Sequence, residues 1–124
     1  MDDMASATAK AAIDVCTEIE QERLKQINHR GYDSGHDDFH YSRKPDLLRV
    51  ALIYASRTTW PEEANGQLPE GWPWSADEWK PGTPRDMLIK AASLIVAHVQ
   101  LLDRAAEREA AQVEDDGGAT DAEG

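Results

Sequence analysis

Six of the seven carboxylates between residues 18 and 46 of the chain are candidates for binding a metal ion. They are Glu18, Glu20, Glu22, Asp37, Asp38 and Asp46. If helices bring such oxygens together, they repel one another unless they share a proton or a hard cation, and Mg²⁺ prefers an octahedron of oxygen ligands. Two interpretations stay open: a charged helix face in water, or a magnesium site that serves a phosphate substrate.

Two histidines flank one pair of these acids. His36 and His40 stand on either side of Asp37 and Asp38. Imidazole together with carboxylate suits Zn²⁺, Mn²⁺ or Fe²⁺, so Mn²⁺ is a candidate cofactor beside Mg²⁺. The same side chains could instead form hydrogen bonds that order a loop.

A segment rich in tryptophan and proline contains Trp72-Pro73-Trp74 and Trp79-Lys80-Pro81. Indoles next to proline are held stiffly, and a stiff aromatic face can stack a nucleobase for about 1–3 kcal/mol. The basic residues Lys80, Arg85 and Lys90 could hold phosphate groups nearby. The alternative is that Trp72 and Trp74 only pack an irregular connection onto the helices.

Helices are the elements that must position these side chains. Residues 5–30 read as one helix, and Gly31 follows as a stop. Its apolar face, which includes Ile13 and Cys16, is expected to be buried. A second helix begins near Pro45-Asp46 and is apolar nearly all round, which predicts a central position. A third is expected from about residue 84 to residue 109, after an irregular connection over 58–83.

These elements predict an all-α fold. The expected architecture is a small helical bundle of two long helices and a buried middle helix, with a long Trp/Pro-rich loop packed over them. Residues 1–109 form the single helical domain, and residues 110–124 form an acidic, disordered tail. With 124 residues and 40% apolar side chains the core is small, so association into a homo-oligomer would help.

Composition and charge exclude several classes of protein. No apolar run approaches the roughly 18 residues of a membrane span, and the acidic start is unlike a signal peptide, so we expect no membrane partner and a cytoplasmic location. The single Cys16 excludes an internal disulfide framework. The net charge is −11, of which −6 falls on residues 105–124. Polymeric nucleic acid is therefore not an expected partner, whereas a small anionic ligand is compatible with a local basic cluster.

The chain resembles a group of small phage and bacterial helical proteins over about residues 18–104. That group resembles, more distantly, the all-α NTP pyrophosphatases (MazG-like), which hold Mg²⁺ with acids from neighbouring helices. The segments that carry the resemblance are Glu22-Arg23, Gly31-Tyr32, His36-Asp37-Asp38, Asp46-Leu47, Tyr54-Ala55, Trp72-Pro73-Trp74, Lys80-Pro81, Arg85-Asp86 and Leu102-Asp103-Arg104. The resemblance implies a nucleotide site and places Glu22, Asp38 and Asp46 as metal-side carboxylates.

The function predicted on these grounds is a Mg²⁺-dependent nucleotide pyrophosphohydrolase. Its metal ligands would be Glu22, Asp37, Asp38 and Asp46, with Glu22 and Asp38 in the catalytic role. The substrate-binding residues would be Trp72, Trp74, Lys80, Arg85 and Lys90. The alternative is a non-catalytic nucleotide- or protein-binding module, for example a phage factor that sequesters a host signal or protein. A third interpretation is a purely structural helical oligomer.

Overall fold

The computed structural model describes residues 2–31, 33–41, 44–57 and 68–123. For residues 2, 29, 30 and 114–123 it describes the backbone alone. The described residues form four α-helices, one 3-10 helix and no strand. The α-helices are α1 (Asp2–Arg30), α2 (Ser34–Tyr41), α3 (Asp46–Arg57) and α4 (Pro84–Glu123), and the 3-10 helix is η2 (Ala76–Glu78). The predicted all-α fold is confirmed. Among the helices so described, none combines the length and apolarity that crossing a membrane requires.

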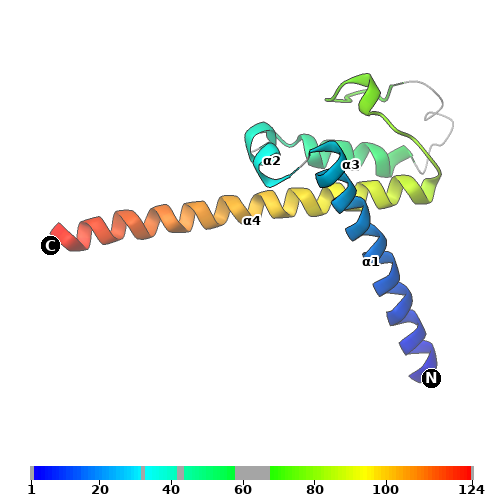
Figure 1. The fold of residues 1–124 in the computed structure, drawn as a ribbon, viewed down its shortest axis with the longest axis horizontal. Helices are drawn as coiled ribbons and strands as arrows, with labels where there is room; N and C mark the ends of the chain where they lie inside the picture. Colours follow the sequence, from blue (N-terminus) through cyan, green and yellow to red (C-terminus); the bar gives the residue numbers. More distant parts are fainter. Residues whose placement is uncertain (1, 32, 42–43, 58–67, 124) are drawn as a thin grey trace.

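Helix α4 is the element on which the others assemble (Figure 1). Helix α3 lies along the first half of α4, and α2 packs near its middle. Helix α1 crosses α4, so that the N-terminal part of α1 and the C-terminal part of α4 both project from the body. The body therefore occupies only part of each long helix.

The core is the contact between α3 and α4. Fully or nearly fully buried side chains lie three or four positions apart on each helix, as expected for two apolar faces that pack together. They are Leu47, Val50, Ala51 and Tyr54 on α3, and Met87, Ala91, Leu94, Ala97 and Leu101 on α4. The middle helix is buried on this side as predicted, but its outer side chain Leu52 is 59% exposed.

The apolar face predicted for the first helix is not buried in the chain. Ile13 is 65% exposed, and Cys16 is exposed as well. The expectation that Cys16 lies on a buried face was wrong, because α4 crosses the C-terminal part of α1 (Figure 1) and the side chains of residues 3–17 are exposed. The buried side chains of α1 are instead polar, namely Arg23 and Gln26.

Two helix boundaries differ from those expected. Residues 34–41, expected as a loop or a single turn, form α2, whose first turn is capped where the His36 backbone N–H donates to Asp33 Oδ1 at 2.9 Å. Helix α4 starts at Pro84 as predicted but continues past residue 109 to Glu123. Alanine and glutamate are strong helix formers, and they dominate residues 105–111. The division into a domain and an acidic tail stays a prediction.

Candidate functional site

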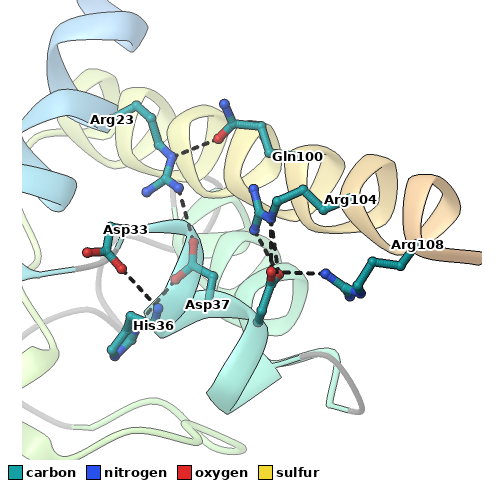
Figure 2. A network of polar contacts seen from close by, with 8 residues as sticks. Arg23, Asp33, His36, Asp37, Gln100, Arg104 and Arg108 are labelled. Carbon is teal, nitrogen blue, oxygen red and sulfur yellow. Dashed lines mark hydrogen bonds and ion pairs between the residues drawn. The ribbon is translucent and has the colours of Figure 1, made fainter. Parts of the chain in front are cut away.

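Asp37 is fully buried, and its partner is an arginine (Figure 2). Arg23 Nη2 on α1 donates to Asp37 Oδ2 at 3.0 Å, and His36 Nδ1 lies 3.2 Å from Asp37 Oδ1. Arg23 also donates through Nε to Gln100 Oε1 on α4 at 3.1 Å. The carboxylate thus joins α1, α2 and α4 through one guanidinium.

Asp38 is neutralised in the same way by α4. Arg104 donates to both of its carboxylate oxygens at 3.0–3.2 Å, and Arg108 Nη1 donates to Oδ2 at 3.1 Å (Figure 2). The hydrogen bond from Arg104 is the main reason that the pKa of Asp38 lies below its ordinary value, with the charges of both arginines adding to it. The two adjacent aspartates therefore bind different cationic side chains.

Asp46 lies in the first turn of α3, near the buried phenol of Tyr41. Burial raises the pKa of Tyr41 well above its ordinary value, and the negative charges of Asp37, Asp46 and Glu78 raise it further. The Tyr41 hydroxyl is therefore held in its neutral form.

The four predicted metal ligands do not form a common cation site in this arrangement. Arg23 donates to one oxygen of Asp37, whose other oxygen lies beside His36 Nδ1. Arg104 and Arg108 donate to the two oxygens of Asp38. Over the ranges that the structure covers, no three His, Cys, Asp or Glu side chains gather closely enough to hold an ion. A role of Glu22, Asp37, Asp38 and Asp46 in binding Mg²⁺ or Mn²⁺ stays a prediction.

A groove lies where α1 crosses the start of α4. Its volume is about 550 Å³. Three of the predicted site residues line it, namely Glu22, Arg85 and Lys90, and the remaining charged side chains of its wall are Glu18, Lys25 and Asp86. The wall of the groove therefore contains three acidic and three basic side chains.

Arg85 and Glu18 form an ion pair across this groove. Both terminal nitrogens of the guanidinium donate to the two carboxylate oxygens, which is the bidentate arrangement that also recognises phosphate. The hydrogen bond from Arg85 holds the pKa of Glu18 below its ordinary value. Their side chains are 61% and 43% exposed, so a ligand in the groove can reach the pair.

A small polar cavity adjoins the groove. Glu22 and Lys90 line both spaces, and the cavity also has Gln26, Tyr54 and Trp74 in its wall. Its volume of about 10 Å³ corresponds to about one water molecule. Gln26 Nε2 donates to Ser93 Oγ at 2.7 Å, while its buried Oε1 accepts no hydrogen bond from any residue that the structure describes.

The tryptophan segment packs against Tyr54 of α3. Trp79 is stacked on the Tyr54 ring at 4.9 Å between centroids, and Trp72 meets Trp79 edge-on at 5.1 Å. Trp72 Nε1 donates to the backbone carbonyl of Ser75 at 2.9 Å. These contacts correspond to the packing interpretation for Trp72. Trp74 lines the small cavity, which has room for about one water molecule. Stacking of a ligand ring on Trp74 stays a prediction.

The Tyr54 hydroxyl fixes this segment to the helices. It accepts a hydrogen bond from the Lys80 backbone N–H at 3.1 Å and donates to the Glu78 carbonyl at 3.4 Å. Lys90 Nζ donates to the Lys80 carbonyl at 2.8 Å. The backbone of Lys80 thus positions the ammonium of Lys90, while the Lys80 side chain is exposed.

The sequence did not reveal the residues that neutralise the predicted site aspartates or that line the groove and the cavity beside the predicted site residues. Arg23 and Arg104 are separated from their aspartates by 14 and 66 positions, so no local spacing pattern reveals the pairs. Lys25 and Gln26 also face the groove or the cavity without a recognisable motif. The connecting residues 58–67 lie outside the described residues.

Comparison of the chain with protein-family models, with curated proteins and with solved structures finds no match. The class defined by the fold and the groove is therefore an all-α protein with a charged groove between two crossing helices.

Proposed function

We propose that the chain is a binding module for a small phosphate-bearing ligand of the nucleotide class. The observation that carries the proposal is the groove itself, in which Arg85 and Lys90 stand among acidic side chains. A phosphate group would meet the two basic side chains. The adjoining cavity, with Trp74 in its wall, has room for about one water molecule, so the ring and sugar of the ligand would lie in the groove.

The volume of the groove supports a ligand of this size. Pockets for small molecules typically have about 300–1,000 Å³, and the groove has about 550 Å³. Its acidic residues Glu18, Glu22 and Asp86 would accept hydrogen bonds from ring nitrogens or sugar hydroxyls. They would also disfavour a long polyanion, in agreement with the net charge of −11.

We propose binding alone, because the predicted magnesium ligands include two aspartates already paired with arginines. No hydrolytic step is assigned to the groove. Glu22 is the predicted catalytic residue that lines it. Hydrolysis of a bound nucleotide is therefore tested separately, by a search for its products.

The test is a titration of the full chain with ATP, ADP, AMP and inorganic pyrophosphate, followed by tryptophan fluorescence. We expect a saturable change with the nucleotides. Lys90→Ala should weaken the affinity about tenfold, since a hydrogen bond to a charged group contributes about 1.5–3 kcal/mol. Arg49→Ala is the matched control, because Arg49 is exposed on α3 and lines a different hollow.

Absence of a saturable change with all four ligands would contradict the proposal, as would equal loss of affinity in Lys90→Ala and Arg49→Ala. Incubation of the wild-type chain with ATP and Mg²⁺ or Mn²⁺, with a search for AMP and pyrophosphate, separates binding from hydrolysis.

A further inference from the structure

Helix α2 carries two histidines one turn apart on the same face. His36 and His40 stand four positions apart, a spacing that makes side chains neighbours on a helix. Their ring centroids are 4.4 Å apart, and the planes of the rings are inclined by 43°. The His40 side chain is exposed, and that of His36 is 27% exposed. Both imidazoles are therefore within reach of an ion from solvent.

The contact with Asp37 determines which nitrogen of His36 is suited to bind an ion. Asp37 Oδ1 lies 3.2 Å from His36 Nδ1, and a carboxylate oxygen accepts a hydrogen bond (Figure 2). The ring proton is therefore on Nδ1, and the lone pair is on Nε2. Histidines that bind metal ions almost always donate their other ring nitrogen to a carboxylate, a carbonyl or water, which orients the ring and makes the ligand nitrogen more basic.

Asp37 holds this orientation because it is itself fixed. The aspartate is fully buried, and Arg23 Nη2 donates to its Oδ2 at 3.0 Å. Asp33 lies at the same end of α2, where its Oδ1 accepts from the His36 backbone N–H at 2.9 Å. The exposed Asp33 carboxylate adds negative charge beside the histidines, which favours a cation there.

The distance between the two rings suits two ligands of one ion. With a metal–nitrogen distance of about 2.0–2.1 Å, each ring centre lies about 3.2 Å from the ion, so two bound rings are about 4.5 Å apart at a right angle and about 5.2 Å apart at the tetrahedral angle. The observed 4.4 Å is close to the right-angle value. Adjacent ligands of Ni²⁺ and Cu²⁺ in tetragonal sites meet at about this angle.

We propose that His36 and His40 bind a divalent transition-metal ion, with Asp37 as the positioning residue of His36. Imidazole suits Zn²⁺, Ni²⁺ and Cu²⁺, whereas Mg²⁺ prefers oxygen ligands. Two protein ligands leave the other positions of the ion to water. Neither histidine lines the groove, so this site is separate from the proposed site for a phosphate-bearing ligand.

Isothermal titration calorimetry of the full chain with NiCl₂ tests the site. We expect saturable binding that an excess of Mg²⁺ does not compete for. His36→Gln and His40→Gln should each weaken the affinity at least tenfold, because loss even of a partner outside the ligand set costs about 10–100-fold. His98→Gln, which removes a histidine from α4, is the matched control and should bind as the wild type does. Cys16→Ser should do the same, and it tests the exposed thiol, which is another ligand for such ions.

Electron paramagnetic resonance of the Cu²⁺ complex counts the imidazole ligands. In a Cys16→Ser background we expect two equatorial nitrogens, and one in either His36→Gln or His40→Gln, with unchanged helical circular dichroism. Absence of saturable Ni²⁺ binding, unchanged affinity in either variant, or an equal loss in His98→Gln would overturn the proposal. Nucleotide binding is measured without metal ions, so the two proposals can fail separately.

Discussion

Arg23 on α1 and Asp37 on α2 form a buried ion pair at 3.0 Å, in which the aspartate is fully removed from solvent. Removal of one partner leaves an uncompensated buried charge, which typically costs about 3–5 kcal/mol. We therefore expect Asp37→Ala to lower the free energy of unfolding by about that amount in urea denaturation. The double variant Arg23→Met/Asp37→Leu should recover a large part of the loss. If Asp37→Ala costs less than about 0.5 kcal/mol, the pair is not a structural element.

Asp38 should make the stability of the chain depend on pH in the acidic range. Its pKa is lowered in the folded state by the hydrogen bond from Arg104, so the ionised form stabilises the fold. The contribution is fully present above the ordinary aspartate pKa of about 3.9 and is lost as the pH falls through the lower folded value. We expect it to be about 1 kcal/mol, because the pair is partly exposed.

The measurement is the thermal unfolding midpoint between neutral pH and about pH 2. Asp38→Asn should lower the midpoint at neutral pH and reduce its decline in acid. Asp103→Asn, an exposed aspartate on the same helix as the arginines, provides the control. Identical pH profiles for Asp38→Asn and the wild type would show that the arginines do not stabilise Asp38.

Tyr54 should determine how firmly the tryptophan segment is held. Tyr54→Phe removes the acceptor of the Lys80 N–H at 3.1 Å and the donor to the Glu78 carbonyl. We expect a loss of about 1–2 kcal/mol in the free energy of unfolding and a weaker near-ultraviolet circular dichroism signal from the tryptophans. An unchanged near-ultraviolet spectrum would mean that ring packing alone orders the segment.

Glu18 should compete with a phosphate ligand for Arg85. Because Glu18 accepts from both terminal nitrogens of the guanidinium, Glu18→Gln should release the guanidinium and increase the affinity for inorganic pyrophosphate. Glu107→Gln makes the same charge change on the exposed part of α4 and should have little effect. A lower affinity in Glu18→Gln would show instead that Glu18 positions Arg85 for its ligand.

The sequence predicted the helices better than their contacts. Helical periodicity identified α1, α3 and the start of α4, because each pattern is local. It did not show where α1 crosses α4, so Ile13 and Cys16 were assigned to a buried face that lies beyond the crossing. The aspartate pairs were missed for the same reason, since Arg23 and Arg104 reach their partners only through the tertiary arrangement. Among the predicted site residues, the structure brings Glu22, Arg85 and Lys90 to one groove.

The central claim is tested most directly by isothermal titration calorimetry of the full chain with ATP at physiological salt. The account predicts saturable binding of one ATP per chain, with the affinity weakened about tenfold in Lys90→Ala and unchanged in Arg49→Ala. Heats equal to those of dilution for the wild-type chain would contradict it.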